Sequence, residues 1–143
     1  MCRKASFELP GLSKSVPAAR RLVADEARGW GVGEDVVYLV ALLTSELTSN
    51  AVRFSGDGIR VELWLHRGSL EISVEDRAGG TPAARQRAPW ETSGRGLEIV
   101  DTLSQDWGVR DRPAGKTVWS SLAVALPEGQ GDCPDCACEP ESG

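Results

Sequence analysis

The sequence has no apolar run long enough to cross a membrane, and no apolar stretch follows the basic residues near its start. A membrane helix needs roughly 20 apolar residues, and a secretory signal needs an apolar core. A clustered basic face is also not expected. Residues 1–126 contain all 16 basic residues but also 16 of the 21 acidic ones, so this part of the chain is neutral overall. These absences favour a cytoplasmic protein that binds no membrane and makes no direct contact with nucleic acid.

Cysteine is scarce, with Cys2 near the start and Cys133, Cys136 and Cys138 near the end. None of the four lies in the periodic part of the chain, so disulfides are not expected to hold the core together. The segment 127–143 also has five acidic residues and no basic one. We expect it to be a flexible acidic tail. A metal- or redox-responsive tail that uses its three thiols is the minor alternative.

The length of 143 residues predicts one domain with one sizeable core. Helical spacing predicts helices at 15–30, at 34–55 and in part of 94–108, and Ser15 is the expected N-cap of the first. Alternation predicts single strands at 5–10, 107–113 and 115–126. It also predicts two strands within 59–76, joined by a turn at Arg67–Gly68–Ser69. Residues 77–93 show no periodicity and are predicted to form a long loop of the kind that often acts as a lid. This order predicts an α+β fold, a two-layer α/β sandwich whose mixed, mostly antiparallel sheet has its helices on one face.

Alternation also assigns the two faces of the predicted sheet. Val61 and Leu63 share one face, whereas Trp64 and the only histidine, His66, share the other, where His66 is expected at the surface. Trp119 is also expected on that outer face. The two tryptophans either form an exposed aromatic patch, which often marks an interface, or pack under the N-terminal strand or the tail.

The segment "LLTSELTSNAVRFS" aligns a carboxylate and a carboxamide beside an apolar stripe. Glu46 and Asn50 are four residues apart, so they project from the same face of the predicted helix. An amide oxygen suits Mg²⁺ that bridges substrate phosphates, and a carboxylate one turn away can orient a nucleophile or accept its proton. A solvated helix face is the alternative, because this spacing is common there.

Two further features point to a nucleotide. Asp76 ends a strand and is followed by Gly79 and Gly80, so it is either a hydrogen-bond acceptor for a flat donor such as an adenine amino group or a turn-forming Asp. The run "SGRG" at 93–96 opens a helix, and the free backbone N–H groups of such a start suit phosphate. The loop region also carries four arginines against Glu91: Arg77, Arg85, Arg87 and Arg95.

The ordered motifs "ELTSNAVRFS", "VEDRAGGTP", "GRGLEIVDTLSQDWGVR" and "GKTVWSSL" resemble the GHKL (Bergerat-fold) ATP-binding superfamily. They are most similar to the small bacterial anti-sigma-factor serine kinases, and the resemblance covers residues 6–126. It implies ATP and Mg²⁺ as cofactors, Glu46 as the general base or water-orienting acid, Asn50 as the Mg²⁺ ligand and Asp76 as the reader of adenine. It further implies nucleotide contacts at Arg53, Gly80, Arg85, Arg87, Gly94, Arg95, Gly96, Leu97 and Thr117.

The implied reaction is transfer of the ATP γ-phosphate to a serine or threonine of an anti-sigma antagonist (STAS-type) protein, together with sequestration of a sigma factor. A homodimer is a further expectation of this family. The chain departs from the superfamily pattern at Ala78, where a glycine is usual, and at Phe54, where a histidine is common. The alternative is therefore a catalytically inactive module of the same fold that regulates transcription by partner exchange without ATP turnover.

Overall fold

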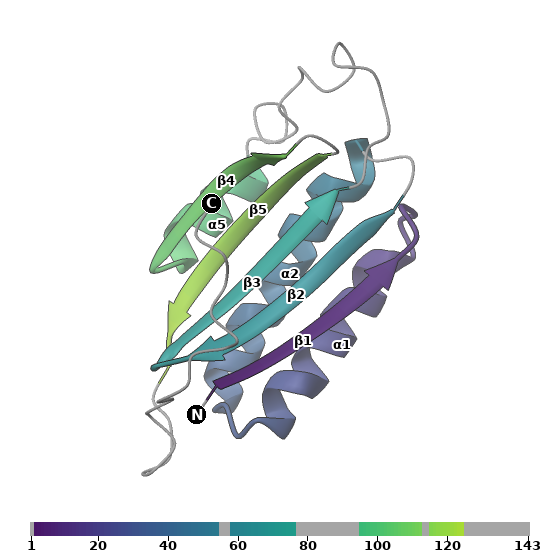
Figure 1. Ribbon diagram of the computed structural model, residues 1–143. Helices are drawn as coiled ribbons and strands as arrows, with labels where there is room; N and C mark the ends of the chain where they lie inside the picture. The colour runs from purple at the N-terminus through teal and green to yellow at the C-terminus, as the bar shows by residue number, and fades with distance from the viewer. Residues whose placement is uncertain (1, 55–57, 77–94, 113–114, 125–143) are drawn as a thin grey trace.

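The computed structural model describes residues 2–54, 58–76, 95–112 and 115–124 of the chain (Figure 1). The elements follow in the order β1 (Cys2–Leu9), α1 (Ser15–Gly29), α2 (Glu34–Phe54), β2 (Ile59–His66), β3 (Ser69–Asp76), α5 (Arg95–Leu103), β4 (Asp106–Arg112) and β5 (Gly115–Ala123). The first strand begins three residues earlier than alternation predicted. The predicted loop at 77–93 and the predicted tail at 127–143 lie outside the described residues.

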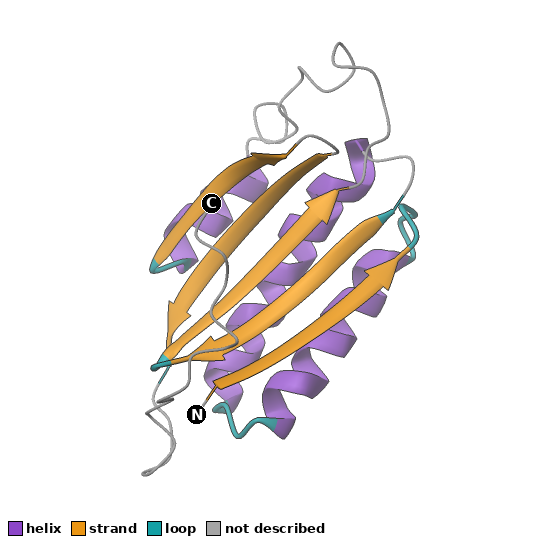
Figure 2. Ribbon diagram, in the orientation of Figure 1, coloured by secondary structure: helices purple, strands orange, loops and turns teal. Residues whose placement is uncertain are grey.

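The five strands form one sheet in the order β1-β2-β3-β5-β4. Each of its four pairings is antiparallel. The three described helices, α1, α2 and α5, lie on the same face of this sheet (Figures 1 and 2). The α+β fold with two layers is therefore confirmed. We call the helix-covered face the inner face and the opposite one the outer face.

The hydrophobic core lies between the inner face and the helices. Its strand residues come from the alternate positions that the sequence pattern assigned to this face, and they are almost fully buried: Ile59, Val61, Leu63, Leu65, Leu70, Ile72, Val74 and Leu122. The helices contribute small residues from α1 and larger ones from α2, among them Ala19, Val23, Val40, Leu43 and Leu47. Burial of this apolar surface is the main force that holds the two layers together.

Helix α1 begins differently from the sequence prediction. Ser15 is not the N-cap; the cap position is Lys14, and its side chain makes no capping hydrogen bond. Ser15 is the first helical residue, and its Oγ donates to the carbonyl of Pro10 at 2.6 Å. The hydroxyl therefore ties α1 back to the end of β1 instead of satisfying a free N–H of its own helix.

The turn between β2 and β3 is shorter than expected. His66 pairs with Ser69, so only Arg67 and Gly68 form the connection. Both have positive φ angles, 49° and 77°. This is the backbone of the two-residue hairpin turns whose twist matches that of the strands. The tight turn fixes the register by which every inner-face residue of β2 meets its partner in β3.

Helix α2 carries buried hydroxyl groups in its middle. Thr44 Oγ1 donates to the carbonyl of Val40 at 2.7 Å, and Thr48 Oγ1 donates to that of Thr44 at 2.6 Å. These bonds satisfy the hydroxyls within the helix, so they need no partner from the sheet. In the part of the chain that the structure describes, no helix is long and apolar enough to cross a membrane.

Candidate functional site

The C-termini of β3 and α2 and the N-terminus of α5 lie at the same end of the sheet. Asp76 closes β3 and pairs with Ile59, the first residue of β2. Helix α2 ends at Phe54, and only four residues separate it from Ile59, so its last turns lie at this same end (Figure 1). Strand β4 runs in the same direction as β3, and α5 leads into its start, so the N-terminus of α5 points back to the Asp76 end. We call this region the Asp76 end.

Asn50 lies in the last turns of α2 and is only 7% exposed. A buried amide needs a hydrogen-bond partner, which native structures supply from the protein, from water or from a ligand. Glu46, one turn earlier, is half-buried. The helical prediction for this pair is confirmed, and a fully solvated helix face is excluded for Asn50.

Asp76 is 9% exposed, and it occupies the inner face at the point where the apolar pattern of β3 ends. The backbone N–H of Lys116 donates to its Oδ1 in a long hydrogen bond of 3.4 Å. A Cβ atom on Gly115 would overlap the backbone oxygen of Asp76 and come within 3.0 Å of its Oδ1. The start of β5 therefore packs directly on this carboxylate, and glycine is required there by the close approach of two backbones.

The sequence analysis missed this role of Gly115 and Lys116. Both belong to the motif "GKTVW", from which only Thr117 was assigned to the site. The sequence signal for them is the glycine that opens a strand, since a glycine in a strand often marks a close backbone approach. The pairing of that glycine with Asp76 depends on the order of strands, which the local sequence does not encode.

Thr117 is buried, but its register differs from that of Asp76. It pairs with Glu75, whereas Lys116 pairs with Asp76. Because side chains alternate along a strand, Thr117 belongs to the outer face. The structure therefore brings Thr117 to the same end of the sheet as Asp76 but on the opposite face, and a nucleotide contact of Thr117 stays a prediction.

Arg95, Gly96 and Leu97 form the first turn of α5, as the sequence predicted. Backbone N–H groups at such a helix start are free to bind an anion, and the helix dipole favours negative charge there. Arg53 is exposed in the last turn of α2 at the same end. Four other predicted residues lie outside the described ones: Gly80, Arg85, Arg87 and Gly94. The two departures, Ala78 and the side chain of Phe54, also lie outside them.

The donor set at the Asp76 end fits a magnesium nucleotide. Asn50 offers a hard amide oxygen of the kind that Mg²⁺ accepts while it keeps several waters. Asp76 offers a buried carboxylate, and a charge-assisted hydrogen bond to such a group is stronger than a neutral one. The start of α5 adds N–H groups suited to phosphate. These are group types that could hold a magnesium nucleotide, and their assignment to parts of that ligand stays a prediction.

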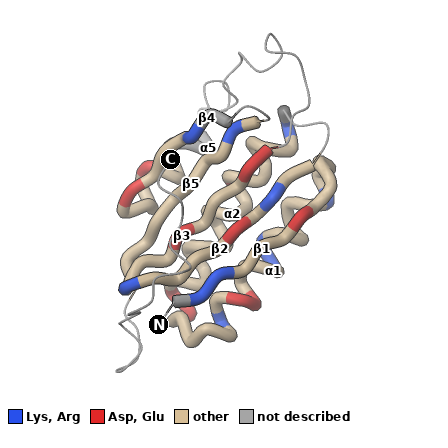
Figure 3. Tube along the Cα trace, in the orientation of Figure 1, with Lys and Arg blue, Asp and Glu red and all other residues tan. Residues whose placement is uncertain are grey.

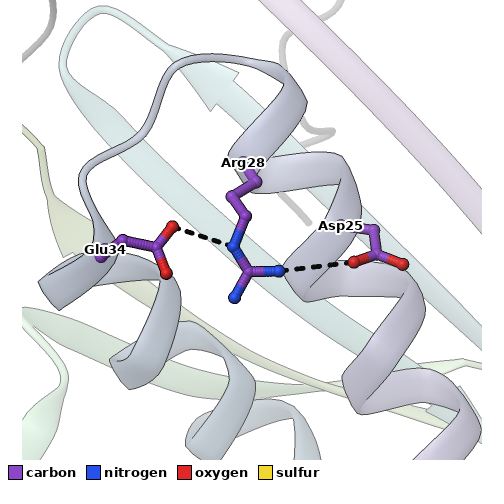
Figure 4. A network of polar contacts seen from close by, with 3 residues as sticks. All are labelled: Asp25, Arg28 and Glu34. Carbon is purple, nitrogen blue, oxygen red and sulfur yellow. Dashed lines mark hydrogen bonds and ion pairs between the residues drawn. The ribbon is translucent and has the colours of Figure 1, made fainter.

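A separate groove of about 460 Å³ lies between α1 and α2, away from the sheet. Its lining includes Arg20, Arg21 and Tyr38, and Tyr38 is 70% exposed. At one end Arg28 Nε donates to Glu34 at 2.8 Å and its Nη1 to Asp25 at 3.4 Å (Figure 4). The hydrogen bond to Glu34 raises the pKa of Arg28, so its charge is held in place. Within the described ranges, Arg20 and Arg21 have no such acidic partner.

Comparison with known proteins is consistent with this geometry. The chain is similar to a crystal structure of the RsbU and RsbW domains of Rv1364c from Mycobacterium tuberculosis, with a TM-score of 0.68 and 20% sequence identity. The match covers 87% of this chain and 33% of the Rv1364c chain, so this chain spans about a third of the length of that protein chain. A search of curated proteins finds no match. Residues 9–122 match the family model described as the histidine kinase-like ATPase domain, and the chain therefore belongs to that family.

Proposed function

We propose that this protein is an ATP-binding anti-sigma regulatory factor that phosphorylates a serine or threonine of a STAS-type antagonist and sequesters a sigma factor. The observation that carries the proposal is the pair of buried polar groups at the Asp76 end, Asn50 and Asp76, in a chain of the histidine kinase-like ATPase family. The likeness to a structure that includes an RsbW domain supports the anti-sigma branch. The motifs from Gly94 to Arg110 and "GKTVW" support the same branch.

Each residue of the site has a distinct role in this proposal. Asp76 accepts a hydrogen bond from the adenine amino group, and its burial excludes the water that would compete for it. Asn50 provides a protein ligand to Mg²⁺, and Glu46 orients the attacking hydroxyl or accepts its proton. Bound Mg–ATP supplies the transferable phosphoryl group and neutralises charge on it. The protein mainly positions these groups, which is sufficient for phosphoryl transfer.

The first test is calorimetric titration with ATP, with and without Mg²⁺, of the unaltered chain and of Asp76→Asn. Loss of a hydrogen bond to a charged group costs about 1.5–3 kcal/mol, so ATP affinity is expected to fall roughly 10- to 150-fold. Asp25→Asn is the matched control, because Asp25 is an exposed carboxylate on α1. Equal affinity in Asp76→Asn and the unaltered chain would contradict the adenine role.

The second test separates the kinase from a binding module. Asn50→Ala is incubated with radiolabelled ATP, Mg²⁺ and a purified STAS-type antagonist. The proposal predicts that phosphorylation is lost while the complex with the antagonist still forms. Ser49→Ala, the neighbouring half-buried position, is the control and is expected to retain phosphorylation. Phosphorylation by Asn50→Ala at the unaltered rate would contradict a magnesium role for Asn50.

The second candidate function is a non-catalytic module that binds its partner without ATP turnover. The groove between α1 and α2 favours it, because Arg20, Arg21 and Tyr38 offer positive charge and an exposed aromatic ring away from the nucleotide end. Such a surface fits an acidic segment of a partner protein, to which charge complementarity would give specificity. The module predicts no heat with ATP at millimolar concentration, and partner binding that Arg20→Glu and Arg21→Glu together abolish.

A further inference from the structure

Ser120 is a buried polar residue on the inner face of the sheet. It lies in β5 between Val118 and Leu122, whose side chains also belong to this face, and it is fully buried. It is set back from the Asp76 end, because Lys116, earlier in β5, is the residue that pairs with Asp76. A small apolar residue would fill the same space without a polar atom that needs a partner. Packing alone therefore does not explain a serine at this position.

The partner of the Ser120 hydroxyl is the hydroxyl of Ser104, the residue that directly follows α5. The two Oγ atoms share a hydrogen bond. The backbone N–H of Ser104 donates to the carbonyl of Val100 at 2.9 Å and so closes the last turn of the helix. The N–H of the next residue, Gln105, donates to the carbonyl of Ser121 at 2.8 Å. The C-terminal end of α5 is therefore attached to β5 by one side-chain and one backbone hydrogen bond.

A further side-chain hydrogen bond attaches the same end of α5 to β4. Trp107 Nε1 donates to Oδ1 of Asp101, which lies in the last turn of the helix, at 2.9 Å. Trp107 pairs with Ser120 in the sheet, so the side chains of both residues belong to the inner face. Two neighbouring strands thus hold one end of α5, and attachment at two points restricts the tilt of the helix as well as its place.

Charge separates the attached end of α5 from the end at which phosphate binding is proposed. Acidic residues lie at the attached end, Asp101 in α5 and Asp106 at the start of β4, and their charges would repel a phosphate (Figure 3). Basic residues lie at the Asp76 end, among them Arg53 and Lys116 (Figure 3). The two ends of this nine-residue helix are roughly 13 Å apart at 1.5 Å per residue. The hydroxyl pair can therefore affect a bound phosphate only through the helix.

We propose that Ser120 is a positioning residue for the nucleotide phosphates: through Ser104 it fixes the tilt of α5 and so places the N–H groups at the start of that helix. This inference rests on the proposed function. Along a helix of this length, a tilt of about 5° moves the first N–H groups by roughly 1 Å. Such a shift exceeds the range of about 0.5 Å over which N–H···O distances are favourable. Adenine, by contrast, is proposed to bind at Asp76 in β3, which the tilt of α5 leaves in place.

The test compares Mg–ATP with adenosine, which has the same base but no phosphate. Both are titrated calorimetrically into the full chain and into Ser120→Ala and Ser104→Ala, which remove the same hydrogen bond from its two sides. Each variant is expected to bind Mg–ATP about fivefold more weakly, as for one lost hydrogen bond, and to bind adenosine unchanged. The double variant is expected to lose no more than either single one, because both remove one interaction. Ser121→Ala, the next residue of β5 but on the outer face, is the matched control and is expected to change neither affinity.

The outcomes separate this inference from the proposed function. If the unaltered chain bound neither ligand, the proposed function would fail, and this inference with it. If the unaltered chain bound Mg–ATP and both serine variants bound it equally well, the inference alone would be overturned. It would also be overturned if the variants lost the same share of affinity for adenosine as for Mg–ATP, because the hydroxyl pair would then support the fold as a whole. Urea denaturation checks that each variant is folded, and Ser104→Ala, at a half-buried position, is expected to fold even if Ser120→Ala does not.

Discussion

The two faces of β2 and β3 are built from alternate residues of the same strands, yet their buried residues differ in polarity and in hydrogen bonding. On the inner face, Val61, Leu63 and Ile72 are fully buried against the helices. On the outer face, Trp64 is 7% exposed, and its Nε1 and Glu71 Oε2 are buried atoms with no hydrogen-bond partner among the described residues. These inner-face residues are stabilised by apolar packing, whereas burial of the polar atoms on the outer face costs free energy of folding.

The inner face is not apolar throughout, because Ser120 and Asp76 also lie on it, and Asp76 lies where function is proposed. Asp76 continues the inner-face parity of β3 beyond Val74, but it places a carboxylate beside the last turns of α2. A protein that needed only stability would keep an apolar residue there. The sheet therefore combines an apolar core that stabilises the fold with a polar end at which ligand binding is proposed, and its outer face carries buried polar atoms.

The largest expected effect comes from breaking the inner face. Leu63→Ala removes a fully buried side chain and leaves a cavity, which is expected to lower the free energy of unfolding by about 2–5 kcal/mol. Urea denaturation measures it. Glu62→Ala, one residue away on the outer face, loses only a surface pair with Lys4 at 3.7 Å and is expected to cost about 1 kcal/mol or less. Equal losses at both positions would remove the distinction between the faces.

The next effect concerns the polar end. Gly115→Ala places a methyl group against the backbone of Asp76, so the two strands must separate, at an expected cost of about 1–3 kcal/mol. The same variant is expected to weaken ATP binding, because the carboxylate moves. Gly29→Ala is the control: nothing lies within 4 Å of its new methyl group, and it ends a helix. Unchanged stability and ATP affinity in Gly115→Ala would show that this contact is unimportant.

A smaller, pH-dependent effect is expected on the outer face. Burial raises the pKa of Glu71 above its usual 4.5, so the folded state holds this proton more tightly than the unfolded state does. The resulting stabilisation is fully present below pH 4.5 and is lost as pH rises through the folded-state pKa. Glu71→Gln stays neutral, so it is expected to raise the urea midpoint at pH 7 and to give no gain at pH 4.

Glu8→Gln is the control for the outer-face carboxylate, since Glu8 is exposed and pairs with Arg60 at 3.3 Å. It is expected to change the midpoint little at either pH. If Glu71→Gln shifted the midpoint equally at pH 7 and pH 4, ionisation of Glu71 would not be the cause. The raised pKa of Glu71 would then not explain the change in stability.

The smallest effect lies outside the sheet altogether. Arg28→Ala breaks the exposed contacts with Glu34 and Asp25 shown in Figure 4, and it is expected to cost about 0.2–1 kcal/mol. Thermal unfolding at low and high salt measures it, because screening weakens such pairs. A loss larger than that of Leu63→Ala would mean that the helix layer, and not the inner face, limits stability.

Sequence pattern predicted most of the architecture and part of the site. Spacing located α2 and placed Glu46 and Asn50 on one of its faces, because a helix period is a local property. It located Asp76 at the end of a strand for the same reason. It did not predict that Gly115 packs on Asp76, because strand order is set by the whole sheet. It also wrongly predicted Ser15 as an N-cap. The Ser15 hydroxyl donates to the carbonyl of Pro10, a contact that capping preferences do not predict.

By itself, the sequence determined the order of the elements and the division of the strands into an apolar and a polar face. Both follow from local periodicity and from the cost of leaving apolar surface in water. Only the tertiary structure decided that Asn50, Asp76 and the start of α5 meet at one end, because that depends on antiparallel register across distant strands. It also decided that Trp64 is buried, because burial depends on what lies above a residue as well as on its place in the strand.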